Sequence, residues 1–542
     1  MTYLPLLLLC FSAAWGATVS EPAQSGGTLK MVMRGEPKTF DPFLVEDESS
    51  GMIRYMTGGV LIRLNRKTQK AEPALASAWN ISDAGRRITF RIREGIRFSD
   101  GTPFTPEDVA ATLKRLTDSK HPTPSSDSFG SDGGPAVVEV LPDGQVSLRF
   151  SKPRAGVEML FDAVIISSSK SPLKEKAALG PFFVKEYKPG QYVQLDRNTY
   201  YWKTNAQGKR LPYLDGVRLE IQTNREMELL RFRRGELHLV NQLDAEMYER
   251  LQTEKGKVVL DGGPSLEAEF LWFNLNPASP VTAQKRSWFQ SAAFRLAVSE
   301  ALNREDICRI VYHGKAQPAS GPVSPSNTFW FNRALKPLAY APENALKRLK
   351  AEGFSKNGQS LVDNSGRAVE FSLITNSGSK IREKIAAMVQ QDLAKIGIRV
   401  NIVTLDFPSL IERIAKNWDY EACLLGLVNV QLDPNSEMNV WMSSAANHQW
   451  NPGQKSPATS WEAELDKNML AQAAAVDASK RKLYYDQVQR IAVEQSPFIY
   501  LINRNTLAAS SPGLKNLSIS TLYPQTFWNI DELFLEGSAV RK

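Results

Sequence analysis

The spacing of apolar side chains predicts both strands and helices along the chain. In residues 88–92 apolar and polar side chains alternate, which is the pattern of a strand buried on one face. After Thr105, Pro106 stands at a first helical position and Asp108 stands where it would complete a capping box, so a helix is predicted to begin there. The apolar face of this helix is formed by Val109, Leu113 and Leu116.

The segment 370–427 predicts strands and helices in strict alternation. Apolar residues share one side of its first helix, and Gly397 provides the residue that ends it. The loops between the elements are short, which favours parallel strands joined by right-handed crossovers. The predicted strands are 370–375, 398–405 and 420–427, and the predicted helices are 381–397 and 409–418.

Further elements are expected on both sides of that segment. Residues 28–33 predict a leading strand, and residues 177–202 predict two strands around a Lys-Pro-Gly turn. A helix-to-strand run is expected at 228–240 and one continuous helix at 294–314. The remaining predictions are strands at 270–276 and 497–503, and a helix at 480–495.

Composition is that of an ordinary globular protein. Of the 542 residues 42% are hydrophobic and 23% are charged, and the formal net charge is +8. The basic residues are scattered, which favours a solvated basic surface over nucleic-acid binding. The apolar run 4–17 is too short to span a bilayer and reads as a signal peptide (residues 1–17), so a periplasmic location is predicted. A lipid anchor on Cys10 is less favoured because the bulky Leu9 precedes it.

Reactive chemistry has little support in the sequence. Beyond the signal peptide only Cys308 and Cys423 remain, either as buried thiols or as one disulfide. The sequence contains no HExxH, CxxC, GxxxxGK[ST] or GxSxG motif. We therefore expect no enzyme activity, no metal site and no cofactor. A nickel or haem role would need histidines to converge from four distant positions, namely His121, His238, His313 and His448.

Two segments resemble a known family. PALASAW (residues 73–79), followed by a strand and then FSDGTPFTPEDV (residues 98–109), is similar to the signature region of bacterial extracytoplasmic solute-binding proteins of the peptide/oligopeptide/nickel class, which serve ABC importers. The two-strand segment 177–202 and the run 228–240 match further elements of that family.

The resemblance implies an α/β fold, a two-lobed clamp with mixed sheets that closes on a ligand. Two strands would cross between the lobes, and the first lobe would carry an extra strand-rich subdomain. The first lobe is expected to comprise residues 26–55, 171–266 and 502–542, its subdomain residues 56–170, and the second lobe residues 270–500.

The resemblance also implies ligand-binding positions in the loop 426–434. Peptide-binding relatives hold the ligand's α-amino group with an aspartate, because an unpaired ammonium in a closed cleft is costly. The matching residue here is Val430, which puts the binding of ordinary free-amino peptides in doubt. Asn429 lies just past the strand end. Asp433 either supplies a shifted charge or shapes the turn.

Other candidates follow from position. Glu46 matches a family site near the ligand, with a solvated loop acid as the alternative. Phe407 stands where relatives place a cleft tryptophan, with core packing as the alternative. A polar and aromatic loop offers flat apolar faces with polar edges that suit a ligand cleft. Its candidates are Trp441, Asn447, His448 and Trp450.

These observations predict a monomeric receptor that captures a small peptide or polar organic solute and passes it to an ABC permease with its ATPase subunits. One alternative is the same fold with a non-peptide ligand such as a sugar, an opine or a metal complex. A second is a sensory or chaperone-like clamp, and a distant third is a cleft hydrolase.

Overall fold

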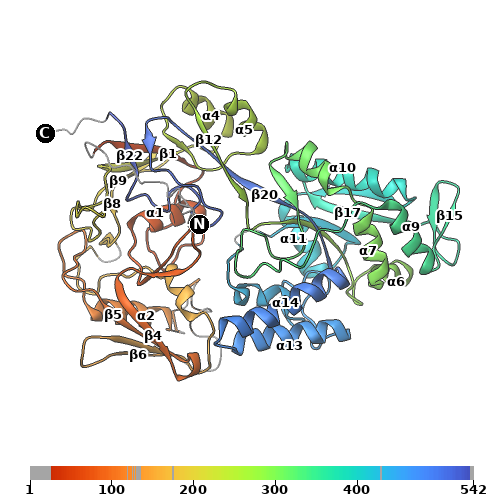
Figure 1. Cartoon of the computed structure of the whole chain (residues 1–542), viewed down its shortest axis with the longest axis horizontal. Helices are drawn as coiled ribbons and strands as arrows, with labels where there is room; N and C mark the ends of the chain where they lie inside the picture. Colours follow the sequence, from red (N-terminus) through yellow and green to blue (C-terminus); the bar gives the residue numbers. More distant parts are fainter. Residues whose placement is uncertain are drawn as a thin grey trace, which may run out of the picture.

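A computed structural model shows two lobes side by side, with both ends of the described chain in the same lobe (Figure 1). It describes residues 26–118, 120–121, 123–124, 126, 129, 136–173, 176–427 and 430–537. The predicted signal peptide and Cys10 lie outside these residues. Among the described residues, no helix combines the length and the apolar content that crossing a membrane requires.

The helices vary from one turn to five. Their bounds are α1 Glu48–Thr57, α2 Pro106–Leu116, α4 Arg225–Arg233, α5 Ala245–Gln252, α6 Ala283–Gln290, α7 Ala292–Glu300, α8 Arg304–Asp306, α9 Pro342–Ala351, α10 Lys380–Lys395, α11 Phe407–Glu412, α12 Met438–Trp441, α13 Ser460–Ala474 and α14 Ala478–Gln495.

The strands are mostly short, apart from β20. Their bounds are β1 Thr28–Met33, β2 Ile62–Leu64, β3 Ala71–Pro73, β4 Ala76–Ser82, β5 Arg87–Ile92, β6 Val137–Val140, β7 Val146–Arg149, β8 Phe182–Lys188, β9 Tyr192–Arg197, β10 Gly216–Ile221, β11 Leu239–Val240, β12 Val258–Pro264, β13 Glu269–Phe273, β14 Ala316–Pro318, β15 Ser355–Asn357, β16 Ser360–Val362, β17 Glu370–Asn376, β18 Arg399–Leu405, β19 Ala422–Gly426, β20 Phe498–Ser510, β21 Leu514–Lys515 and β22 Phe534–Leu535.

The strand β20 connects the two lobes. Its first half pairs with β13 and β14 of the second lobe, and its second half pairs with β11 and β12 of the first. Within the described residues this produces a 12-stranded sheet with the path β18-β17-β19-β13-β20-β11-β1-β10-β9-β8. Figure 1 shows β20 running from one lobe into the other. The segment between β12 and β13 crosses beside it, so the predicted pair of crossing strands is confirmed.

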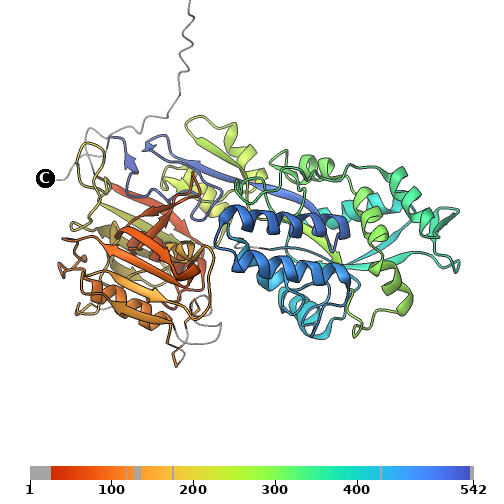
Figure 2. The ribbon, with the colours of Figure 1, turned by 60° about the horizontal axis from the view of Figure 1, so that its bottom comes forward.

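The second lobe confirms the alternation predicted for residues 370–427. β17 pairs in parallel with both β18 and β19, as right-handed crossovers require, and the connecting helices are α10 and α11. The last two long helices, α13 and α14, pack against each other along their lengths (Figure 2). This lobe has an aromatic core in which Phe273 stacks on Phe289 with ring centroids 4.6 Å apart.

The first lobe contains the predicted strand-rich unit. The sheet β4-β5-β7-β6 packs on α2, and both Ile88 and Phe90 of β5 are fully buried, as their alternation indicated. The capping box at the start of α2 is present, with Asp108 Oδ2 accepting from the Thr105 amide at 2.8 Å. The other Asp108 oxygen accepts from the Ser169 amide at 2.7 Å, which fastens α2 to the segment after β7.

The prediction of one continuous helix at residues 294–314 is wrong. The chain forms α7, leaves the helix at residues 301–303, and resumes with α8 and a π-helical turn, Ile307–Val311. The break occurs at Asn303, whose side chain accepts from the Asp306 amide and so caps a new helix. Gly314, with φ of 74°, follows the end of the π turn.

The two cysteines are free thiols. Cys308 and Cys423 are both buried, so the disulfide alternative is wrong. Burial raises the pKa of Cys308 to about 12 and that of Cys423 well above its usual range.

Candidate functional site

The two lobes touch along a seam that faces the loop after β19. Asn435 donates from Nδ2 to the carbonyl of Ala155 in the first lobe at 3.1 Å. In a second contact, Gln69 of the first lobe accepts from the amide and the hydroxyl of Thr328, both at 3.0 Å. These hydrogen bonds join the two lobes directly, in addition to the segments that cross between them.

A cavity of about 150 Å³ lies where the crossing segments meet the second lobe. It sits at the carboxyl ends of β17 and β19 and at the start of α10, which is where open α/β sheets usually bind ligands. Its lining residues are Glu267, Ala268, Glu269, Tyr312, Ser379, Ile381, Arg382, Gly426, Leu427 and Arg504.

Two arginine–carboxylate pairs dominate the polar lining. Arg382 donates to both oxygens of Glu269, at 2.8 and 3.1 Å, and a third nitrogen donates to Asn376 at 3.0 Å. Arg504 forms a second pair with Glu267. The cavity therefore presents charged groups of both signs whose charges balance, which suits a polar ligand better than a strongly charged one.

The Tyr312 hydroxyl lies in the wall of this cavity and is not engaged by either ion pair. Tyr312 is 4% exposed, and its hydroxyl has no hydrogen-bond partner among the described residues. Burial is the main cause that raises the pKa of Tyr312 far above its ordinary value, so the hydroxyl stays protonated. In this cavity the hydroxyl is a donor that a ligand oxygen can accept from.

Local sequence explains how Arg382 reaches the cavity. Ser379 caps α10 and accepts from the amide of Arg382 at 3.4 Å, which sets Arg382 in the first helical turn. Glu269 opens β13 and pairs in register with Gly426, at the end of β19. The ion pair thus joins the crossing segment to the helix that follows β17.

Sequence reasoning missed these cavity residues. No local motif marks Glu267, Glu269, Tyr312, Arg382 and Arg504, because the site is assembled from five separate segments. One usable signal was present, since Arg382 and Glu269 each lie at the boundary of an element that the periodicity had predicted.

The loop after β19 contains three of the predicted site residues. Asn429 lies outside the described residues. Val430 is half-buried and packs beside an apolar cluster with members from both lobes. That cluster comprises Leu266, Leu432 and Leu522, with Leu64 and Met159 at its edge.

Asp433 forms a bidentate ion pair with Arg481. The two bonds measure 2.8 and 2.7 Å, and the side chain of Arg481 is only 4% exposed. Asp433 Oδ1 also accepts from the Asn435 amide at 2.9 Å and so caps the short helical turn Pro434–Glu437. Of the two roles considered for Asp433, shaping the turn is the one these bonds describe.

The polar and aromatic loop is part of the second lobe's core. Trp450 is fully buried and Trp441 is 2% exposed. Both the ring of His448 and the indole nitrogen of Trp450 reach Glu462 Oε1, at 3.2 and 3.0 Å. In this conformation the two tryptophans and His448 act through packing. Asn447 is exposed.

The two remaining candidates are exposed. Phe407 begins α11 and is 53% exposed, so core packing does not describe it. Glu46 is exposed and stands two residues before α1.

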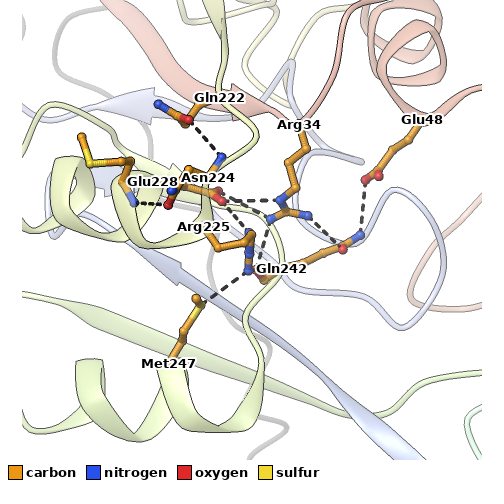
Figure 3. Close-up of polar contacts among 9 residues, drawn as sticks. Arg34, Glu48, Gln222, Asn224, Arg225, Glu228, Gln242 and Met247 are labelled. Carbon is orange, nitrogen blue, oxygen red and sulfur yellow. Dashed lines mark hydrogen bonds and ion pairs between the residues drawn. The ribbon is translucent and has the colours of Figure 1, made fainter. Parts of the chain in front are cut away.

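A polar network reaches Glu48, the first residue of α1 (Figure 3). Gln242 donates to Glu48 at 3.4 Å and accepts from Arg34 at 3.0 Å. The carboxylate of Glu228, which is 2% exposed, receives both Arg34 and Arg225. This network ties α1 to the ends of β1 and β11 and to α4.

The histidines do not converge among the described residues. His121 contacts Asp118, His238 accepts from the Lys30 amide, His313 pairs with Glu249, and His448 contacts Glu462. No group of three potential metal ligands is found in the part of the chain that the structure describes.

Comparison with known proteins gives concordant matches. The family model described as bacterial extracellular solute-binding proteins, family 5 Middle, matches residues 70–449. A probable ABC transporter-binding protein of Deinococcus radiodurans is 25% identical, over 95% of this chain and 94% of that protein. The oligopeptide-binding protein AppA of Bacillus subtilis is also 25% identical, over 95% of this chain and 94% of that protein.

Solved structures share the fold. AppA in complex with a nonapeptide gives a TM-score of 0.69 at 24% identity and covers 95% of this chain and 100% of AppA. NikA from Brucella suis in complex with Fe(III)-EDTA gives a TM-score of 0.77 at 20% identity, covering 94% of this chain and 100% of NikA. These neighbours are two-lobed binding proteins.

Proposed function

Because the chain belongs to the bacterial extracellular solute-binding proteins, family 5, we propose that it captures a peptide or similar polar organic solute between its lobes. It acts outside the cytoplasm as a monomer and delivers the solute, chemically unchanged, to the permease and ATPase subunits of an ABC importer. The observation that supports this proposal is the charge-balanced cavity where the crossing segments meet the second lobe, with the Tyr312 hydroxyl in its wall.

Closure supplies the mechanism. A ligand shifts a clamp toward its closed form only by as much as it binds that form better. In the closed form the ligand meets Arg382 and Tyr312 from the second lobe and Glu267 and Arg504 from the crossing segments. We propose further contacts from Glu46, Phe407, Val430 and Asn447, which keep exposed surface, and from Asn429.

The charges near the cleft bear on the class of ligand. Free-amino peptides need a carboxylate for the ammonium group. Val430 offers none, Asp433 is engaged by Arg481, and Glu267 and Glu269 are each engaged by an arginine. This supports a solute without a free α-amino group, such as a blocked peptide. It also favours the alternative of a non-peptide ligand, and NikA was solved with a metal chelate.

Two measurements test the proposal. Native mass spectrometry of the purified protein identifies what it carries. Thermal unfolding with matched peptide pairs, free or acetylated at the amino terminus, compares the two classes. A ligand at 100 times its Kd stabilises the fold by about 2.7 kcal/mol. We expect stabilisation by acetylated peptides or by a non-peptide solute; strong stabilisation by free-amino peptides alone would show that the inference from Val430 is wrong.

The functions from other classes have their own tests. Turnover of the bound solute would establish the hydrolase alternative. Neighbouring genes for permease and ATPase subunits support import, and their replacement by genes of a signalling receptor supports the sensory alternative.

A further inference from the structure

The first lobe contains a second and larger cavity, of about 250 Å³. It lies between α1 and β8, which pack against each other (Figure 1). β8 is the edge strand at the end of the sheet opposite β18, and no described residue of the second lobe lines the cavity. The cavity is therefore separate from the one where the crossing segments meet the second lobe.

The walls of this cavity are mainly apolar, and one of its polar atoms lacks a partner. The hydroxyl oxygen of Ser167 is buried and makes no hydrogen bond. Such an atom is costly unless a ligand or water completes it. The apolar walls include Phe40, Ile53, Ile165, Leu179 and Val184.

The charged lining is predominantly basic. Arg54, Lys176 and Lys185 line the cavity, against a single carboxylate in the described lining, Glu186. The Glu186 carboxylate already accepts from the hydroxyl of Tyr192 at 3.1 Å. Lys185 falls at a β-bulge, where the register with β9 shifts, and bulges often occur beside binding sites.

Arg54 is the half-buried member of this basic set. Its guanidinium has no ion pair and no hydrogen bond among the described residues. Asp162 acts on it electrostatically, but Asp162 is already shared by Arg66 at 2.8 Å and Arg63 at 3.5 Å. Arg54 therefore has no carboxylate partner of its own among the described residues, and burial is the main cause that lowers its pKa. An anion placed beside Arg54 would offset the cost of burying its charge.

We propose that this cavity binds a second ligand, a small organic carboxylate with an apolar body, independently of the solute in the cleft. The apolar walls enclose the body of the ligand. The carboxylate is held by Arg54 and accepts from the Ser167 hydroxyl, while the two lysines attract it to the opening. A lysine-rich opening and a half-buried arginine select an anion over a neutral molecule of the same shape.

The test is calorimetric titration of the full-length mature protein with hexanoate, octanoate and decanoate, and with octanol as the neutral match for octanoate. Each added methylene is expected to tighten Kd about fourfold until the cavity is filled, which corresponds to about 0.8 kcal/mol per buried CH₂. Octanoate should bind at least tenfold tighter than octanol.

The variants separate this site from adventitious binding. R54Q should weaken octanoate binding at least tenfold and leave octanol unchanged, while R54K should restore part of the loss. S167A should weaken octanoate binding severalfold without removing a charge. The matched control is R309Q, because Arg309 is 70% exposed in the second lobe and its loss should change nothing.

Some results would overturn the proposal. These are equal binding of octanoate and octanol, undiminished binding by folded R54Q, no octanoate binding at millimolar concentration, or competition between octanoate and a solute bound in the cleft. Simultaneous binding of octanoate and the cleft solute supports the proposal. This test does not depend on the identity of the solute in the cleft.

Discussion

Replacing Asp433 with alanine tests whether this residue anchors a turn or contacts the solute. Arg481, its partner, is 4% exposed, and removing one member of a buried ion pair typically costs about 3–5 kcal/mol. Arg481 keeps Gln472 Oε1 at 2.9 Å and the Gln472 carbonyl at 3.2 Å, so the low end of that range applies. Loss of the cap on Asn435 adds about 1 kcal/mol. We expect D433A to lower the unfolding free energy by about 3–4 kcal/mol.

Urea unfolding followed by tryptophan fluorescence measures this loss, because Trp330 lies 5.0 Å from the Arg481 guanidinium. The matched control is D419A. Asp419 is 58% exposed and its pair with Arg413 spans 3.7 Å, so the change should stay within about 0.5 kcal/mol. If D433A unfolds like the wild type but loses solute binding, Asp433 is a ligand contact and the assignment to the turn is refuted.

Three further predictions concern the seam and the buried groups. Burial opposes ionisation of Glu462, but its hydrogen bonds outweigh this effect and hold its pKa at about 2. Its stabilising contribution is therefore full above about pH 4.5 and disappears as the pH falls toward 2. In urea unfolding the wild type should lose about 3 kcal/mol of unfolding free energy over that pH range, and the loss should be smaller in E462Q. Gly156 has φ of 65°, and a Cβ there would lie 2.7 Å from Asp433 Oδ2 and 2.9 Å from Arg481 Nη1. G156A should therefore separate the two lobes at the seam and increase the radius of gyration measured by X-ray scattering. An unchanged radius would show that the Asp433 and Arg481 side chains move aside instead. Cys308 and Cys423 should resist a thiol reagent in the native protein and react in urea, and rapid native labelling would contradict their burial.

The sequence predicted the regular elements of the fold from local periodicity. The alternation around Ile88 and Phe90, the capping box at Asp108 and the alternation of strands and helices in residues 370–427 are all present. Each of these signals lies within a few residues. The break at Asn303 was not predicted because the apolar face continues across it. The Asn303 side chain nevertheless accepts from the Asp306 amide, and this local hydrogen bond starts a new helix.

The site was harder to predict because its residues are distant in sequence. Glu269 and Arg382 are brought together only by the pairing of β13 with β19 and by the start of α10. Trp450 suggested a cleft because its neighbours are polar. Inside the lobe, Glu462 of the following helix accepts hydrogen bonds from Trp450 and Gln454. The polar side chains of this loop are therefore paired in the core, and their polarity did not mean that the loop is exposed.

The family match and the fold leave the bound solute as the central question. A crystal structure of the protein as purified from its natural host, without unfolding, tests the account most directly. Density for a chemically intact solute is expected in the cavity where the crossing segments meet the second lobe, within hydrogen-bond distance of Tyr312 and Arg382. A solute held elsewhere while that cavity contains only water would contradict it.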